Sequence, residues 1–256
     1  MGYVVAVVVT GRDLSLRQQH TRPIPAIMER IDKILSNQGY CTRKFAKLFL
    51  KDHDVTANGI RLLDPSDKVN STDMLINGEP LDHPEGIFIL LNKPKGYVCS
   101  HDIADGRLVF ELLPDQWLDR NPVPSTVGRL DKDTTGVLLI TDNTKLIHTL
   151  ISPKREIDKE YQVTVDKPLS NHLIKEFAAG TLMLEKEIKP CLPATLTITD
   201  ATHATVVLHE GRYHQVKRMF AHFGYTVTEL HRSRFGEYTI GDLAEGEWID
   251  LKMPVT

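Results

Sequence analysis

The stretch GRLDKDTTG, residues 128–136, combines charged and hydroxyl side chains and runs directly into the branched apolar segment VLLIT. Arg129 and Asp131 lie two residues apart in it. An aspartate on a loop beside a buried strand can act strongly on a bound ligand, because low-dielectric walls screen its charge poorly. In an arbitrary sequence, aspartates in such a pattern more often cap a turn, and the arginine more often lies on the surface. Residue types and spacing alone leave both interpretations open.

Two more reactive side chains lie on segments that could carry them toward this loop. Tyr161 lies in the alternating pattern KEYQVTV, where core packing is the ordinary role of a tyrosine. Lys217 lies on the helical pattern 212–223, beside the apolar positions Phe220 and Phe223. A surface lysine would show the same pattern. A carboxylate buried without a partner tends to protonate, however, so Lys217 is also a suitable counter-charge.

The elements that must position these residues are mostly strands. From Ile87 onward, the segments IFILL, VLLIT, YQVTV, ATVVL, TVTEL and EWIDL are rich in branched residues and predict strands. Helical patterns are fewer, around 144–151, 170–179 and 212–223. Strands that outnumber helices without strict alternation predict an α+β fold. We therefore expect residues 87–254 to form one domain, built on a mixed, mostly antiparallel sheet flanked by helices.

A smaller module is expected before it, over residues 28–80. MERIDKILSNQGY predicts a helix from Met28 that stops near Gly39, and RKFAKLFLKD predicts a second helix capped by Thr42. DVTANGIRL predicts a hairpin that turns at Asn58-Gly59. The remaining segments are a linker at 81–86 and an extension at 1–27, which we expect to be disordered or a start-site artefact.

The second predicted helix has two different faces. Phe45, Leu48 and Phe49 are expected to supply the apolar face. The opposite face carries four cations: Arg43, Lys44, Lys47 and Lys51. Most charge runs are simply solvated, but cations on one face suit a phosphate backbone. A basic helix followed by the VTANG hairpin resembles the S4-type RNA-binding module, which implies structured RNA as the partner. The ending KDHD departs from that family's fuller basic cluster.

The overall composition limits the possible partners. With 31 basic and 34 acidic residues, the net charge is only -3, so any nucleic acid must be bound by a local basic patch. The three cysteines are scattered, which predicts reduced thiols rather than a disulfide framework or a zinc site. The longest apolar run, YVVAVVVTG near the amino terminus, is too short to span a membrane. We expect a cytoplasmic monomer with no membrane partner.

The stretch at 128–143 also resembles the catalytic motif of the RNA pseudouridine synthases, in the GRLDxxTTG form of the branch that acts on ribosomal RNA. Other segments resemble that branch in order and spacing: LLNKPKGYVCS at 90–100, KEYQVTVDKPL at 159–169, EGRYHQVKRMFAHFG at 210–224 and ELHRSRFGEYTIGDLAEGEW at 229–248. With the S4-like module, the resemblance spans nearly the whole chain from residue 28. EGRYHQVKRMF is more similar to members that modify small-subunit (16S) RNA.

This resemblance implies that the N1–C1′ bond of a uridine is broken and C5 is joined to the same sugar carbon. No redox step or group carrier is involved, so no cofactor and no metal are expected. Asp131 is implied as the catalytic carboxylate, and it stays open whether it attacks the sugar, attacks the base or removes a proton. Tyr161 would stack on the uracil, Lys217 would keep Asp131 ionised, and Leu230 would line the site.

A stacked or paired uridine must also be flipped out of its RNA. The resemblance implies that Arg129 fills the gap, because a planar guanidinium can stack and bind phosphate. We expect RNA contacts from ten further residues: Arg43, Lys44, Lys47, Lys51, Lys93, Lys95, Arg212, His214, Arg218 and Arg232. Lys154, Arg155 and Arg234 are additional candidates for phosphate contacts.

The expected partner is ribosomal RNA, either free or within a partly assembled small subunit. The main alternative is the same chemistry on 23S ribosomal RNA or transfer RNA. A non-catalytic S4-type RNA-binding protein is less favoured, because Asp131, Tyr161 and Lys217 are all present.

Overall fold

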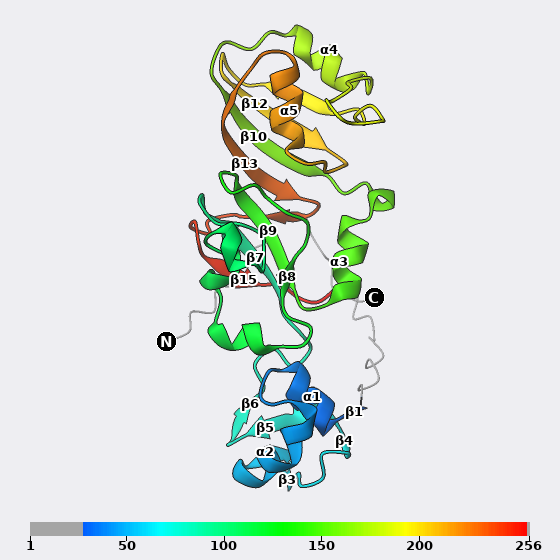
Figure 1. Cartoon of the computed structure of the whole chain (residues 1–256), viewed down its shortest axis with the longest axis vertical. Coiled ribbons are helices and arrows are strands. Elements are labelled where there is room, and N and C mark those ends of the chain that lie inside the picture. The colour runs from blue at the N-terminus through cyan, green and yellow to red at the C-terminus, as the bar shows by residue number, and fades with distance from the viewer. Residues whose placement is uncertain (1–27, 255–256) are drawn as a thin grey trace, which may run out of the picture.

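The computed structural model describes residues 28–254, which form a small module at one end of a larger sheet domain (Figure 1). The amino-terminal extension discussed above lies outside the described residues. Two short helices and six short strands make up the small module, hereafter the amino-terminal module. They are β1 (Met28–Arg30), α1 (Ile31–Asn37), α2 (Ala46–Asp52), β2 (Val55–Ala57), β3 (Ile60–Arg61), β4 (Lys68–Asn70), β5 (Met74–Ile76) and β6 (Glu79–Pro80).

The start of α1 differs from the prediction. Met28 to Arg30 do not begin the helix but form β1, which pairs antiparallel with β4. The helix therefore starts at Ile31, and Ile31, Ile34 and Leu35 are buried in the module's core. The Asn58-Gly59 turn is confirmed, because both residues have positive φ angles, 51° and 75°, between the paired strands β2 and β3.

The apolar face predicted for α2 is also wrong in part. Phe45 and Leu48 are each 53% exposed, and the buried positions are Ala46 and Leu50. The chain first makes a 3-10 turn at residues 43–45, and Thr42 gives no side-chain capping hydrogen bond. The α-helix begins only at Ala46, so its inward face is set by the i, i+4 pair Ala46 and Leu50 rather than by the aromatic residues.

The larger domain is built on a sheet whose main path runs β11-β12-β10-β13-β9-β7-β15, with β8 and β14 paired to β9 and β13. Among the strands of residues 28–254, only β9 and β13 pair in parallel. The predicted α+β class with a mixed, mostly antiparallel sheet is therefore confirmed. The elements are β7 (Phe88–Lys93), β8 (Ser125–Thr126), β9 (Thr135–Thr141), α3 (Thr144–Ile151), β10 (Lys159–Val165), α4 (His172–Ala178), β11 (Thr195–Ile198), β12 (His203–Leu208), α5 (Gln215–His222), β13 (Val227–Phe235), β14 (Tyr238–Thr239) and β15 (Trp248–Asp250).

The central strand β9 explains why VLLI is continuously apolar. Val137 and Leu139 pack into one hydrophobic cluster, and Leu138 and Ile140 pack into another on the opposite face of the sheet. A strand buried on both faces has no polar alternation. At its start, Gly136 has φ +107°, and a Cβ there would lie 2.3 Å from the backbone oxygen of Arg232. Glycine is therefore required for β9 to lie against β13 beside the charged loop.

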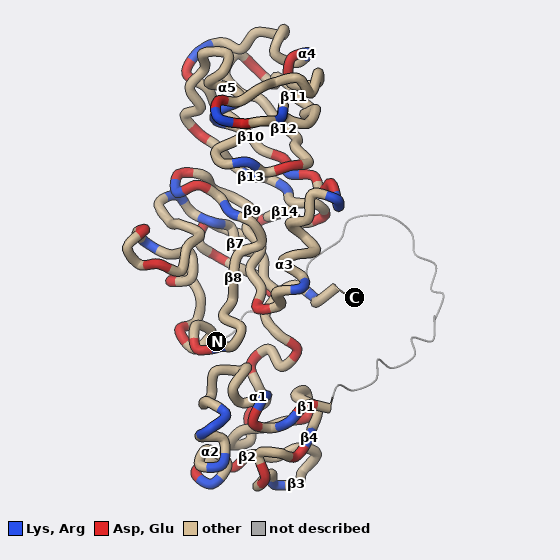
Figure 2. Tube along the Cα trace, turned by 45° about the vertical axis from the view of Figure 1, so that its right-hand side comes forward, with Lys and Arg blue, Asp and Glu red and all other residues tan. Residues whose placement is uncertain are grey.

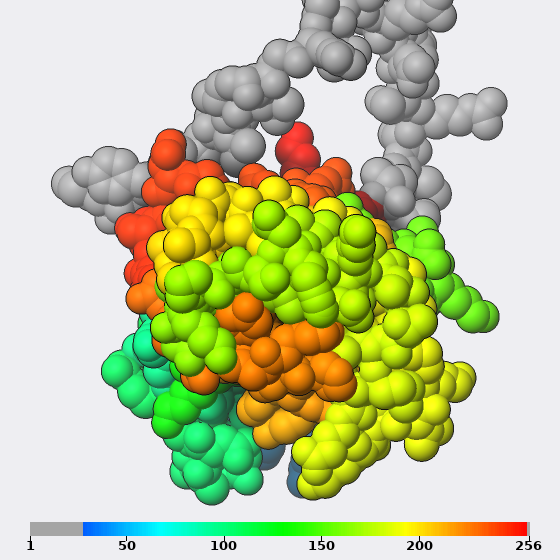
Figure 3. All heavy atoms as spheres, turned by 90° about the horizontal axis from the view of Figure 1, so that it is seen from above, coloured from blue at the N-terminus to red at the C-terminus, as the bar shows by residue number. Residues whose placement is uncertain are grey.

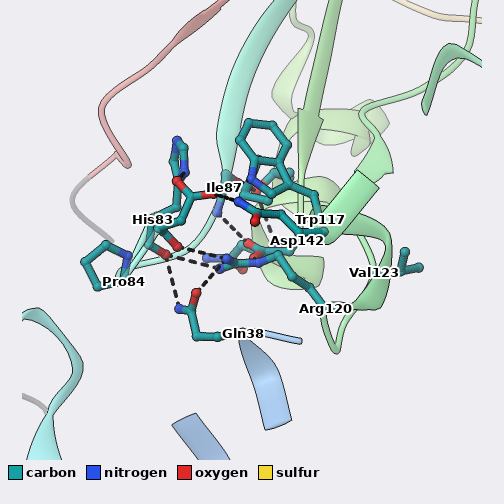
Figure 4. A network of polar contacts seen from close by, with 12 residues as sticks. Gln38, His83, Pro84, Ile87, Trp117, Arg120, Val123 and Asp142 are labelled. Atoms are coloured by element: carbon teal, nitrogen blue, oxygen red, sulfur yellow. Dashed lines mark hydrogen bonds and ion pairs between the residues drawn. The ribbon is translucent and has the colours of Figure 1, made fainter. Parts of the chain in front are cut away.

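The two parts of the molecule are connected by a polar network with a buried centre, hereafter the joint (Figure 4). Arg120 donates to the carboxylate of Asp142 at 3.0 Å, to Gln38 of the amino-terminal module at 2.6 Å, and to the backbone oxygens of Asp82 and His83. His83 also lies between the carboxylates of Asp82 and Asp250, at 2.6 and 2.7 Å. The segment predicted as a linker, residues 81–86, is thus tied to both sides. Within residues 28–254, no helix is long and apolar enough to cross a membrane.

Candidate active site

The loop that carries Asp131 is held by a lysine buried beneath it. Lys93, at the end of β7, is fully buried, and its ammonium donates to the backbone oxygens of Asp131, Lys132 and Thr134 at 3.1, 3.4 and 2.8 Å. The backbone oxygen of Pro94 is a fourth acceptor, at 3.1 Å. Burial lowers the pKa of Lys93 to about 8. One cation therefore fixes three carbonyl groups of the loop and orients the Asp131 side chain outward.

Asp131 lies in a compact group of charges, hereafter the cleft cluster. One carboxylate oxygen is 3.1 Å from the Lys217 ammonium, and the other is 3.4 Å from Nε2 of His214. Lys217 also donates to the carboxylate of Asp133. Burial alone would lower the pKa of Lys217, but its hydrogen bonds to Asp133 and Asp131 outweigh burial and raise that pKa. Burial alone would raise the pKa of Asp133, but the hydrogen bond and charge of Lys217 outweigh burial and lower that pKa below its ordinary value.

Asp131 and His214 of the cleft cluster lie in the wall of a cleft of about 950 Å³, near the upper end of sizes usual for ligand sites. Tyr161, from β10, and the buried Leu230, from β13, lie in the same wall, and these two strands are hydrogen-bonded neighbours. Arg129 is exposed at the cleft, two residues from Asp131. Figure 3 shows α5, in orange, at the surface beside the lime and yellow segments that follow β10. The structure thus brings together Arg129, Asp131, Tyr161, His214, Lys217 and Leu230, all predicted from the sequence.

Two of the residues predicted to contact RNA are buried. Lys93 is fully buried and Arg232 is 2% exposed, although Arg232 lies in the wall of the cleft. Lys93 binds loop carbonyls, as described above. Arg232 donates from Nε to the backbone oxygen of Val137 at 2.8 Å, and its guanidinium lies over the ring of Phe235. Both cations therefore stabilise the backbone that surrounds Asp131.

Arg212 and Arg218 are partly exposed but already have protein partners. Arg212 donates to the backbone oxygens of Lys189 and Pro190 and to the carboxylate of Glu210. Arg218 donates to Glu187 at 2.9 Å and to the backbone oxygen of Glu185. These two arginines connect the segment around α5 to residues 185–190, so their charge is largely compensated within the protein.

Five other predicted RNA contacts are exposed to solvent: Arg43, Lys44, Lys47, Lys51 and Lys95. The first four lie on α2 and on the turn before it, in the amino-terminal module (Figure 2). The exposed Phe45 and Leu48 lie among them, and the Lys44 ammonium is 6.0 Å from the centre of the Phe45 ring. An exposed aromatic ring in a basic face is suited to stack on a base.

Sequence reasoning missed two contributions to the site. Asp133 was not singled out from the sequence, although it shares Lys217 with Asp131. Gln215 is buried, and its side chain accepts from the backbone of Arg212 and donates to Glu210, which fixes the turn before α5. The motif spacing contains no signal for either contact, because the partners come together only in the folded chain. Among residues 28–254, no cluster of three or more side chains suits a metal ion.

Comparisons with known proteins agree with this architecture. Residues 87–222 match the family described as RNA pseudouridylate synthase, and residues 29–75 match the S4 domain. Over 225 residues, 87% of this chain and 95% of the relative, the chain is 40% identical to the ribosomal small subunit pseudouridine synthase A of Pasteurella multocida. The protein of that name from Escherichia coli K12 is 38% identical over 227 residues, which cover 87% of this chain and 96% of the relative. A pseudouridylate synthase of known crystal structure is 33% identical in sequence and superimposes with a TM-score of 0.61. The match covers 87% of this chain and 96% of that chain.

Proposed function

The chain belongs to the RNA pseudouridylate synthase family and is an RNA pseudouridine synthase, and we propose that it converts one uridine of small-subunit (16S) ribosomal RNA to pseudouridine. The choice of RNA rests on the relatives named above, whose names specify the small ribosomal subunit and whose length this chain covers almost completely. We further propose that residues 28–80 act as an RNA-binding domain and residues 87–254 as the catalytic domain, in a cytoplasmic monomer.

The observation that carries the mechanism is the position of Asp131. Its carboxylate lies at the cleft, on a loop whose backbone is fixed by Lys93, and a cation is 3.1 Å away. The base never leaves the enzyme in this reaction, so water need not be activated and one carboxylate suffices, unlike the pair used by most glycosidases. Asp131 is proposed to act on the nucleotide, and Lys217 to supply the positive charge that favours its ionised form.

Entry of the uridine requires that it leave the RNA stack, at a cost of a few kcal/mol. Arg129 is proposed to occupy the vacated space, since it is exposed at the cleft and its guanidinium can stack on neighbouring bases. Tyr161 is proposed to stack on the extruded uracil, with Leu230 as apolar support beside it.

The amino-terminal module is proposed to hold the same RNA at a second point. Its exposed cations, Arg43, Lys44, Lys47 and Lys51, lie on α2 and the 3-10 turn before it, and the joint fixes this module to the catalytic domain. Each phosphate contact releases counterions, so affinity should fall steeply as salt is raised.

The target is tested by incubating the protein with transcripts of small-subunit and large-subunit ribosomal RNA. Pseudouridine is then mapped by carbodiimide labelling and reverse-transcriptase stops. The proposal predicts one new stop, in the small-subunit RNA only. A stop confined to large-subunit RNA would keep the reaction and replace the target. No stop in either transcript, and none in partly assembled subunits, would contradict the proposal.

A further inference from the structure

His214 has an unusual backbone and a direct approach to the cleft cluster. Its φ angle is +46°, in the left-handed region, at the residue immediately before α5. Non-glycine residues in this conformation are uncommon and are often retained at functional sites. The ring is stacked against Tyr213, with 3.9 Å between ring centres and 18° between planes. This arrangement presents Nε2 of His214 to Asp131, 3.4 Å from Oδ1.

The reaction needs a proton acceptor that the assignments above do not provide. When C5 has joined C1′, it still carries its hydrogen, and the ring holds a C6=N1 double bond. Removal of that proton returns the C5–H electron pair to the C5–C6 bond. The C6=N1 pair moves to N1, which takes up a proton. One proton is thus lost at C5 and one gained at N1, with no oxidant or reductant.

The distance of C5 from Asp131 at this stage can be limited from the chemistry alone. Asp131 is proposed to act on the sugar at C1′ or its neighbour, or on the base beside C5. In each case the atom that Asp131 touches lies within about two bonds of C5 once the new bond exists. A proton-accepting side chain next to the Asp131 carboxylate is therefore also next to C5.

Neighbouring groups in the cleft cluster are poorly suited to accept this proton. Lys217 is an ammonium bonded to two carboxylates, and Asp133 is bonded to Lys217. Asp131 is already used for the sugar or the base. A neutral imidazole has a free nitrogen lone pair and exchanges protons readily near neutral pH.

We propose that His214 is a catalytic residue that removes the C5 proton of the joined base and returns a proton to N1 or to water. This role rests on the proposed function, because it is a step within pseudouridine formation. It goes beyond the expectation that His214 contacts RNA.

The test uses His214→Asn, because asparagine tolerates the left-handed conformation while lacking the imidazole. The matched control is His203→Asn, which removes an exposed imidazole at the start of β12 that is bonded only within its own turn, to Asp200 and Thr202. Small-subunit transcripts are prepared with uridine, 5-deuterouridine or 5-fluorouridine. Single-turnover formation of C-linked nucleosides is measured after digestion to nucleosides. A 5-fluoro base can form the C5–C1′ bond but has no C5 proton to lose.

With uridine RNA, His214→Asn should be slower than the wild type by about a hundredfold and should show a larger deuterium isotope effect. With 5-fluorouridine RNA, it should react at the wild-type rate. Equal slowing on both RNAs would show that His214 only positions Asp131, and wild-type rates on both would show no role. Either result overturns the proposal. It is also overturned if Tyr161→Phe, and not His214→Asn, is slow on uridine RNA but normal on 5-fluorouridine RNA. If the wild type forms no C-linked nucleoside at all, the proposed function itself fails.

Discussion

The joint and the cleft cluster contain the same kinds of residue, yet the structure uses them differently. Each has a carboxylate bonded to a basic side chain and a histidine within 3.4 Å of a carboxylate oxygen. At the centre of the joint, the side chains of Arg120 and Asp142 are only 3% and 11% exposed, whereas Asp82 and Asp250, which flank His83, are 39% and 59% exposed. In the cleft cluster, Asp131 and Asp133 are 25% and 58% exposed and share a single lysine.

The difference lies in how completely each charge is satisfied. Arg120 donates to one carboxylate, one amide oxygen and two backbone oxygens, so it has little capacity left for another ligand. The two carboxylates of the cleft cluster share one ammonium and remain partly exposed to solvent, and Asp131 lines the cleft. A satisfied, buried network contributes to stability and geometry, whereas an accessible group with incomplete pairing is available for chemistry.

The largest expected effect in stability comes from breaking the joint. Arg120→Met leaves the Asp142 carboxylate and two backbone oxygens without their partner, and removing one member of a buried pair costs about 3 kcal/mol or more. The free energy of unfolding, measured in urea, should fall by that amount, and residues 81–86 should become easier to cleave with protease.

The control for the joint is Arg61→Met, which breaks the exposed pair with Asp54 in the amino-terminal module. An exposed pair of this kind contributes less than about 1 kcal/mol. If both variants lose the same small amount of stability, the joint does not hold the two parts together.

The next effect tests the cleft cluster. Lys217→Met leaves two carboxylates close together without a cation, which favours protonation of one of them. We expect the rate of pseudouridine formation to fall by roughly a hundredfold, with little change in RNA affinity. Lys217→Arg, which keeps the charge, should retain most of the rate. A Lys217→Met protein that keeps the wild-type rate would remove Lys217 from the mechanism.

The last effect is a pH dependence of stability at Lys93, which is buried like Arg120 of the joint but lies beneath the catalytic loop. Its pKa is about 8 in the folded protein and ordinarily 10.5, so between these values the unfolded chain binds more protons at this site. Stability contributed by this site should therefore rise with pH across that window, by at most about 1.4 kcal/mol per pH unit.

This pH dependence is measured as the difference in unfolding free energy between the wild type and Lys93→Met, which cancels the other titrating groups. The difference should change in favour of the wild type from pH 8 to 10.5. A difference that stays constant would show that the Lys93 ammonium is not destabilised by its surroundings.

Local patterns in the sequence predicted the strands and the reactive loop well. VLLIT is a strand buried on both faces, and GRLDKDTTG lies at the cleft, because periodicity and turn residues act over a few positions. Burial of cations was not predictable in this way. Lys93 is enclosed by carbonyls from residues 38 to 41 positions away, and Arg232 donates to the backbone of β9. The same limit applies to the joint, whose residues come from separate segments with no common motif.

The central claim is that Asp131 performs chemistry while Asp142, in a similar ion pair, maintains the fold. The most direct measurement compares Asp131→Asn with Asp142→Asn by single-turnover pseudouridine formation on small-subunit RNA, corrected for the folded fraction from urea unfolding. The account predicts that Asp131→Asn loses at least about 10⁴-fold in rate with stability nearly unchanged. Asp142→Asn should keep its rate per folded molecule and lose about 3 kcal/mol of stability. Retained turnover in Asp131→Asn would contradict the account.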